Sequence, residues 1–371
     1  MNRINARNTI SLLLTTLFFS TVTLSASAEP PKMKMTTDIP SQITTPDIVE
    51  TRLGTLEFFD GFPTDATAEK VFDNLDFLRG VEVFLNGCPG ASMVALREGL
   101  RDMGAVDGTI FIAETLMNAR SLFLTPNTES IYSGTWLDLK NGPIVAETPP
   151  NVLGILNDFW FRYVADLGIA GPDQGQGGKF LFVGPDYDGE IPEGYFVYRS
   201  PTNGNALLMR GFLVDGDPQP GVESIKKHAR VYPLSGAENP PEQKFINASG
   251  MEVNTVHGND FTFFEELNQI VQEEPAESLD PELLGLFASI GIKKGQPFEP
   301  DERMKQILTE AAAVGNATVR SIYFRGRDKT AYQYDSGYWK TGFVGGSHEF
   351  LSNGARLLDA RAMFYYIATF T

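Results

Sequence analysis

Eight polar and aromatic side chains in the middle of the chain are the best candidates for a binding or catalytic site. They stand at strand starts or alternate with apolar residues. They are Asn127, Thr128, Tyr132, Asp158, Trp160, Tyr163, Lys179 and Arg210. Apolar walls with a few placed polar groups are typical of small-ligand pockets. Asp158 with Tyr163 could act as a general acid–base pair if burial raised the pKa of the carboxyl group. A structural role stays open, because Trp and Tyr in β-rich proteins mostly fill the core.

Nucleophilic and metal-dependent chemistry have less support. His228, His257 and His348 are not spaced as zinc ligands, and Cys88 is the single cysteine. Ser347 precedes His348, but the segment 345–349 lacks the final glycine of a nucleophile elbow. We expect Cys88 to be a small buried side chain at a helix end, with a reactive thiol as the alternative. The sequence therefore predicts no metal site and no cofactor.

Glycine-rich and acidic turns resemble ligand-binding motifs without completing them. Residues 175–180 read Gly-Gln-Gly-Gly-Lys-Phe, whereas a phosphate-binding loop needs Ser or Thr after the lysine and leads into a helix. Residues 186–190 and 215–217 place carboxylates in tight turns but lack a twelve-residue calcium loop. We expect turns stabilised by Asp side-chain hydrogen bonds instead.

The first 28 residues have the layout of a secretory signal peptide. Arg3 and Arg7 precede an apolar run over residues 10–24, and Ala-Ser-Ala at 26–28 is a small-residue cleavage site. An uncleaved membrane anchor is the alternative, although a spanning helix needs roughly 20 uninterrupted apolar residues. We therefore expect an exported protein, periplasmic or secreted, with no stable membrane insertion after cleavage.

The chain is acidic, and this limits its partners. Its formal net charge is −17, and removal of Arg3 and Arg7 with the signal peptide brings it to −19. Nucleic-acid binding needs clustered Lys and Arg, so no nucleic-acid partner is expected. A small-molecule ligand or a protein partner is compatible with this charge, and a homo-oligomer stays open.

Short strands separated by turns are predicted between residues 110 and 214. The candidate strands are 131–137, 144–147, 159–166, 179–183, 195–199 and 207–214. Gly, Pro and Asp turns separate them, and many short strands with frequent turns favour an antiparallel sandwich. Residues 29–60 are expected to be an extended lead-in, with an edge strand over 51–59.

Helices are predicted on both sides of this β region. One begins near Thr64 and stops at Asn86-Gly87, and a shorter one covers 91–103. Residues 215–258 are expected to be loops. Three helices follow, of which the second has the cap Asp280 and Pro281 in its first turn. Residues 321–339 are expected to be irregular, and a last helix is predicted over 348–370.

Several ordered blocks resemble one bacterial family. They include Thr-Pro-Asn-Thr at 125–128, Ser-Ile-Tyr at 130–132, Gly-Gly-Lys-Phe-Leu at 177–181, Pro-Glu-Gly-Tyr at 192–195 and Gly-Ile-Lys-Lys-Gly-Gln-Pro-Phe at 291–298. From about residue 57 to the end, the chain is identified as similar to the domain of unknown function 1254 family. The resemblance implies an immunoglobulin-like β-sandwich with a small helical domain. Such proteins usually continue into a jelly roll, domain of unknown function 1214, which is expected to be missing here beyond its start.

The expected fold class is thus α+β, an antiparallel immunoglobulin-like sandwich with N-terminal helices and a small helical domain. The expected divisions are 1–28 (signal peptide), 29–60 (lead-in), 61–250 (sandwich), 251–320 (helical domain) and 321–371 (approach to the jelly roll).

Two functions stay open. One is a periplasmic binding or assembly module for an apolar or neutral small molecule or a partner protein. The other is a cofactor-independent enzyme, for example a hydrolase, with its site between the sandwich and the C-terminal domain.

Overall fold

The computed structural model describes residues 37, 39–123, 125–335 and 337–370. The predicted signal peptide lies outside these residues. The chain divides into two compact units, Met1–Thr64 and Asp65–Thr371. In the part of the chain that is described, no helix combines the length and the apolar character that crossing a membrane requires.

The first unit contains a small antiparallel sheet. Its strands are β1 (Ile48–Thr51), β2 (Gly54–Phe59) and β3 (Phe62–Pro63), preceded by the 3₁₀ turn η1 (Ser41–Ile43). The predicted edge strand over 51–59 is therefore the turn of a hairpin followed by its second strand, and Thr51 pairs with Gly54 across that turn.

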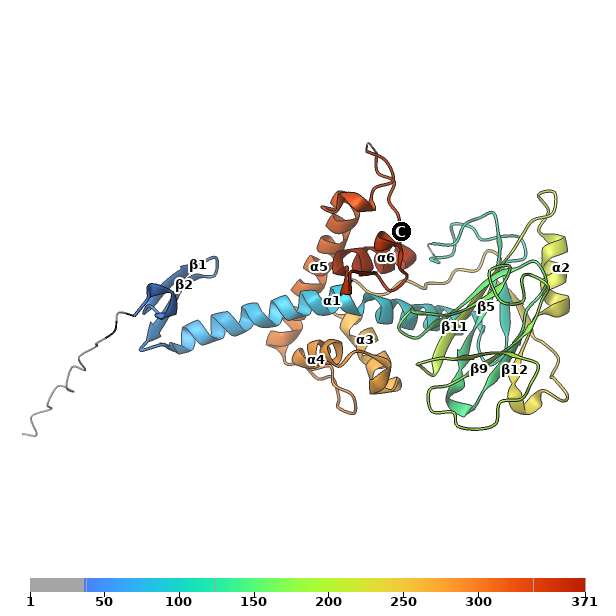
Figure 1. Ribbon diagram of the computed structural model, residues 1–371, viewed down its shortest axis with the longest axis horizontal. Helices are drawn as coiled ribbons and strands as arrows, with labels where there is room; N and C mark the ends of the chain where they lie inside the picture. Colours follow the sequence, from blue (N-terminus) through green and yellow to red (C-terminus); the bar gives the residue numbers. More distant parts are fainter. Residues whose placement is uncertain (1–36, 38, 124, 336, 371) are drawn as a thin grey trace, which may run out of the picture. The chain divides into compact units, whose positions relative to one another are not determined.

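In the second unit, helices surround one long helix (Figure 1). The long helix is α1 (Asp65–Met103), and the others are α3 (Thr262–Glu273), α4 (Pro281–Ser289), α5 (Glu302–Arg325) and α6 (Leu358–Phe370). Their apolar faces share one core, in which Phe84, Phe263, Phe264 and Phe287 are fully buried. Asp280 caps α4 by accepting a hydrogen bond from the Glu282 amide at 2.9 Å, as its sequence predicts.

The predicted helix stop at Asn86-Gly87 is wrong, because α1 continues through it. A Cβ at Gly87 would lie 2.8 Å from Leu267 Cδ2, and a Cβ at Gly90 would lie 2.6 Å from Trp160 Cζ3. These glycines therefore allow close packing instead of ending the helix. Pro89 lies inside α1 and removes one backbone hydrogen bond. Tertiary packing overrides the local preference of this segment.

Two sheets form the β region. The six-stranded sheet has the order β13-β4-β5-β11-β7-β8, and the four-stranded sheet has the order β10-β9-β6-β12. The strands are β4 (Ile110–Ile112), β5 (Ile131–Asp138), β6 (Ile144–Glu147), β7 (Leu153–Asp158), β8 (Tyr163–Gly168), β9 (Lys179–Val183), β10 (Phe196–Arg199), β11 (Gly204–Gly211), β12 (Arg230–Pro233) and β13 (Phe245–Asn247).

Side chains from both sheets share a second core, which contains Leu156 and Leu207 from one sheet and Phe180 and Phe182 from the other. Helix α2 (Gln219–His228) adds Ile225 to it. Figure 1 shows α2 on the side of the sheets away from α1. Most strand pairs are antiparallel, but β13–β4 and β10–β9 are parallel. The mixed α and β character is confirmed, while the immunoglobulin-like topology stays a prediction.

Element boundaries agree with the sequence in part. Strands β6 and β9 have the predicted bounds. The expected strand over 159–166 is wrong in its first half, because residues 159–162 form the turn between β7 and β8. The expected loop over 215–258 contains α2, β12 and β13. The last helix begins only at Leu358, after the short pair β14 (Leu351–Ser352) and β15 (Ala355–Arg356).

The remaining elements are 3₁₀ turns. They are η2 (Leu139–Asn141), η3 (Leu234–Gly236), η4 (Ala276–Ser278), η5 (Lys329–Ala331) and η6 (Val344–Gly346). The turn η4 leads into α4 and contributes to the site described below.

Candidate functional site

A cavity of about 660 Å³ lies within the second unit, between the β7–β8 turn and the helices. The turn contributes one wall, α1 and α4 two more, and the chain from His348 to the start of α6 closes it together with α6 itself. Because these walls come from segments far apart in the sequence, the cavity exists only in the folded second unit. Its size lies in the range of small-molecule sites.

Asp158 organises the turn on the β-sheet side. The side chain is fully buried. Its Oδ1 accepts hydrogen bonds from the amides of Trp160 at 2.9 Å and Arg162 at 2.8 Å, and its Oδ2 accepts one from Arg162 Nε at 2.7 Å. Burial raises the pKa of Asp158, although the charge and hydrogen bonds of Arg162 oppose this effect. Phe161 has a positive φ of 61°, which lets the chain reverse within this short turn.

Trp160 forms a wall of the cavity and connects it to the helices. Its indole Nε1 donates a hydrogen bond to Ser278 Oγ at 3.0 Å. Its ring is stacked near Phe287 of α4, with 6.2 Å between the centroids. The side chain is only 5% exposed, so the wall that it forms is fixed by packing on both sides.

Helix α6 brings Arg361 and Tyr365 to the same cavity. The Arg361 guanidinium donates a hydrogen bond to Asn86 Oδ1 of α1. Burial and the neighbouring charge of Arg356 lower the pKa of Arg361. Burial and the nearby carboxylate of Asp158 raise the pKa of Tyr365 to about 12, while nearby arginines act in the opposite direction. Charged groups of both signs therefore converge around one phenol.

The rim of the cavity is exposed and polar. Tyr163 lies edge-on to His348, with 5.5 Å between the ring centroids. Glu349 and Asp280 also lie at the rim. Arg356 donates a hydrogen bond to the Glu349 carbonyl oxygen at 2.6 Å. The rim therefore carries both signs of charge, whereas the interior is mostly apolar around the buried Asp158.

The structure does not bring the predicted site residues together in one place. Asp158, Trp160 and Tyr163 line the cavity just described. Asn127, Tyr132 and Arg210 line a separate cavity of about 360 Å³. There the backbone N–H of Asn127 donates a hydrogen bond to the Tyr132 hydroxyl at 3.3 Å. The Arg210 guanidinium lies 5.8 Å from the centroid of the Tyr132 ring.

Thr128 and Lys179 line neither of these cavities. Thr128 is exposed. Lys179 pairs with Glu147 across the four-stranded sheet at 2.9 Å, and Tyr232 donates its hydroxyl hydrogen to the same carboxylate at 2.6 Å. Lys179 thus belongs to a cross-strand network, away from the other candidates.

Cys88 contacts His257, a residue too far away in the sequence for the contact to be predicted. Its Sγ lies 3.4 Å from Nε2 of His257, and both side chains are buried. Burial raises the pKa of Cys88 to about 12 and lowers the pKa of His257, so the pair is a neutral thiol and a neutral imidazole. Cys88 is buried as expected, but it lies in the middle of α1. Among the described residues, no three His, Cys, Asp or Glu side chains form a metal-binding group.

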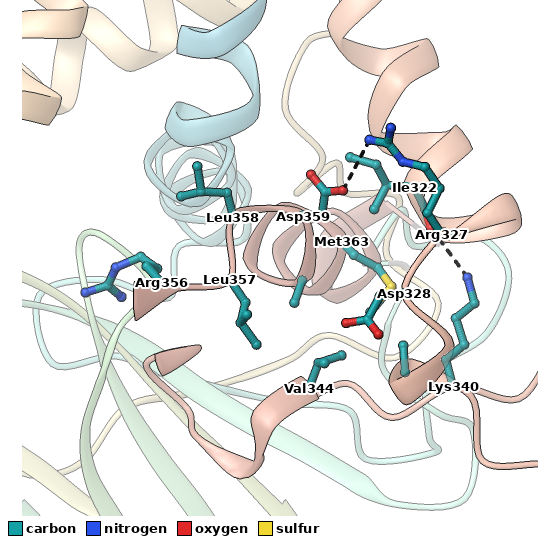
Figure 2. Close-up of a pocket in the computed structure, with 13 residues that line it drawn as sticks. Ile322, Arg327, Asp328, Lys340, Val344, Arg356, Leu357, Leu358, Asp359 and Met363 are labelled. Atoms are coloured by element: carbon teal, nitrogen blue, oxygen red, sulfur yellow. Dashed lines mark hydrogen bonds and ion pairs between the residues drawn. The ribbon is translucent and has the colours of Figure 1, made fainter. Parts of the chain in front are cut away.

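Another cavity, of about 340 Å³, lies beside the start of α6 (Figure 2). Arg327 lies 3.7 Å from Asp359 across it, and Lys340 donates to the Ile322 carbonyl oxygen at 3.4 Å. Arg356 lines both this cavity and the larger one. Figure 2 shows its guanidinium directed away from Leu357 and Met363.

Sequence reasoning missed Arg162, Arg361 and Tyr365, which complete the larger cavity. Arg162 could have been predicted as a site residue, because it follows Asp158 by four residues and directly precedes Tyr163. Arg361 and Tyr365 carried no such signal. Their helix is separated from Asp158 by about two hundred residues, and only the fold brings them together.

Comparison with known proteins supports the resemblance seen in the sequence. Residues 108–233 match the model of the family described as "Protein of unknown function (DUF1254)". This confirms the predicted resemblance over those residues. The match covers β4 to β12, which includes the β7–β8 turn of the cavity.

One solved structure shares the fold over much of the chain, and a second gives only a weak match. The VPA0106 protein from Vibrio parahaemolyticus is 16% identical with a TM-score of 0.50, and the alignment covers 79% of this chain and 68% of that one. An uncharacterised protein from Burkholderia cenocepacia is 12% identical with a TM-score of 0.26, over 69% of this chain and 61% of that one. No curated protein matches the chain.

Proposed function

We propose that the protein is an exported binding protein that holds a small organic molecule in the 660 Å³ cavity of its second unit. The observation that carries the proposal is the combination of this volume with its lining. Trp160, Phe350 and Tyr365 are at most 6% exposed and supply apolar walls, while Asp158 and Arg162 supply a fixed polar pair. Sites of this composition bind small ligands. The export part of the proposal rests on the leader sequence.

The hydrogen bonding of Asp158 favours binding over catalysis. All three hydrogen bonds given above hold the carboxylate within its own turn. A general base must instead direct a free lone pair at a substrate proton. Tyr163 lies at the exposed rim. In the described part of the chain, its hydroxyl forms no hydrogen bond with the buried carboxylate of Asp158. The enzyme hypothesis thus remains the alternative, and it requires a substrate that breaks the Asp158–Arg162 pair.

A screen for thermal stabilisation tests the proposal. Ligands that bind only the folded state raise Tm with concentration. The panel contains neutral, acidic and basic molecules with apolar bodies. In parallel, native mass spectrometry of the protein purified from its exporting host detects any retained molecule. We expect at least one saturable Tm shift or a retained molecule. An unliganded mass and no shift by any member of the panel would exclude the proposed function.

A variant that fills the cavity locates the binding. Leu283 of α4 lines the cavity, whereas Leu284 on the same helix does not. We expect Leu283→Trp to abolish the Tm shift by occupying the ligand's space, and Leu284→Trp to retain it. The Tm of each unliganded variant corrects for effects on folding. Equal ligand shifts in both variants would place the ligand elsewhere.

A further inference from the structure

One half-buried arginine in the large cavity, Arg361, has no carboxylate partner among the described residues. Arg361 hydrogen-bonds to the neutral amide of Asn86. Among the described residues, no carboxylate lies within ion-pair distance of it, whereas Arg162 in the same cavity pairs with Asp158. A half-buried arginine without a carboxylate partner has lost part of its hydration without gaining an ion pair, which is unfavourable.

A second guanidinium increases this cost. Arg356 of β15 lines the exposed rim of the cavity, and its charge contributes to lowering the pKa of Arg361. Neither arginine has an ion-pair partner in the described part of the chain. Two like charges kept close together favour an anion between or beside them.

A third guanidinium presents an unused donor. Nη2 of Arg162 lies 2.6 Å from Asp158 Oδ2, but the angles are not those of a hydrogen bond. This nitrogen is buried and donates no hydrogen bond to any residue that the structure describes. Buried donors without acceptors are rare in folded proteins and indicate a ligand or water.

The carboxylates of the lining form no ion pair with Arg356 or Arg361 among the described residues. Asp158 is paired with Arg162, and Asp280 caps α4. Glu282 and Glu349 are exposed at the rim, where solvent screens them. The interior is therefore a place where an oxyanion meets guanidinium groups and apolar rings.

We infer that the cavity binds an organic anion, with its carboxylate or phosphate group on Arg361 and the Arg162 Nη2 donor and its apolar body against Trp160. The inference rests on the proposed function and names the ligand class, replacing the neutral or apolar ligand expected from the sequence. Guanidinium groups bind such oxyanions by paired charge-assisted hydrogen bonds.

Isothermal titration with matched probes tests the ligand class. The probes are 4-phenylbutyrate, its neutral primary amide and phenyl phosphate, all at the same ionic strength. We expect an acid to bind at least tenfold more tightly than the amide, with stronger binding of phenyl phosphate identifying phosphate as the preferred group. Equal binding of acid and amide overturns the inference while the proposed function stands. Binding of none of the probes at millimolar concentration also overturns it, and the broader screen then decides the proposed function alone.

Variants assign the anchor. Arg361→Gln is expected to weaken acid binding at least tenfold and leave amide binding unchanged, and Arg361→Lys to restore part of the loss. Arg327→Gln is the matched control, because Arg327 is 90% exposed and lines the other cavity. Unfolding curves show whether each variant is folded. Unchanged acid affinity in a folded Arg361→Gln protein contradicts the inference.

Discussion

Trp160 Nε1 donates a hydrogen bond to Ser278 Oγ at 3.0 Å, and this contact ties the β7–β8 turn to the segment that leads into α4. The opposite edge of the same ring faces Gly90 of α1. Trp160 therefore connects its own turn to α1 and to the segment that leads into α4. The shape of the cavity depends on how closely α1 approaches this ring.

Gly90→Ala tests that approach. The added Cβ would lie 2.6 Å from Trp160 Cζ3, in a ring that is 5% exposed. Because the ring is packed on both sides, it cannot move without disturbing its neighbours. Overpacking of this kind costs about 1–3 kcal/mol. We expect urea unfolding to show that loss.

Gly285→Ala is the matched control. Gly285 also lies inside a helix, but nothing lies within 4 Å of a Cβ built there. Alanine is the better helix former, so this variant should gain about 0.5–1 kcal/mol. A Gly90→Ala protein as stable as the Gly285→Ala protein would show that the tryptophan ring moves freely.

Asp158→Asn tests the buried pair. Asparagine retains an oxygen for the amides of Trp160 and Arg162 but removes the charge opposite the guanidinium. Because the Arg162 side chain is 40% exposed, it can regain part of its hydration, and we expect a loss of about 1–3 kcal/mol at pH 7. Asp186→Asn, at an exposed loop residue, should change stability by less than about 0.5 kcal/mol. Chemical denaturation of both variants measures the difference. Equal stabilities would mean that the carboxylate charge contributes nothing.

Local patterns predicted those elements whose ends are set by local chemistry. β6 and β9 lie between Gly and Pro turns, and their observed bounds equal the predicted ones. The cap at Asp280 predicted the start of α4. The pattern failed where packing overrides propensity. Residues 86–90 contain two glycines and a proline, yet α1 runs through them because Leu267 and Trp160 occupy the space that side chains would need.

The candidate site shows the same limit. Asp158, Trp160 and Tyr163 belong to one hairpin, so their proximity follows from sequence distance. Lys179 was grouped with them, yet it lies on the other sheet, because the order of strands is not encoded in any one strand. Arg361 and Tyr365 come from a helix whose docking on α1 depends on the whole core. Sequence alone could therefore indicate only the part of the cavity wall that the β7–β8 turn and the start of β8 form.

Glu266 makes stability depend on pH in a specific window. Burial raises the pKa of this carboxyl group from 4.5 to about 7, although it accepts hydrogen bonds from the Gly258 amide. Since the folded state then binds the proton more tightly than the unfolded state, the cost of ionisation is absent below pH 4.5. It grows as pH rises from 4.5 to 7 and is constant above that.

Glu266→Gln removes this titration while retaining an oxygen for the Gly258 amide. We expect the variant to gain stability over the wild type progressively between pH 4.5 and 7, by about 1–3 kcal/mol at the upper end. Glu277→Gln, at an exposed residue of η4, controls for loss of one negative charge. A stability difference that does not vary with pH would exclude a raised pKa at Glu266.

Cys88 should be unreactive in the folded protein. Its side chain is 2% exposed and its pKa is raised to about 12, while His257 is held neutral beside it. A thiolate is the nucleophile in disulfide exchange, and an exposed cysteine has a pKa near 8.5. We therefore expect a disulfide reagent such as Ellman's reagent to react with the native protein about a thousandfold more slowly than with the urea-unfolded protein.

Rapid, stoichiometric labelling of the native protein would instead support the reactive thiol that the sequence left open. His257→Ala distinguishes the two cases, because an activated thiol would slow on loss of its imidazole, whereas a merely buried one would become more accessible and react faster.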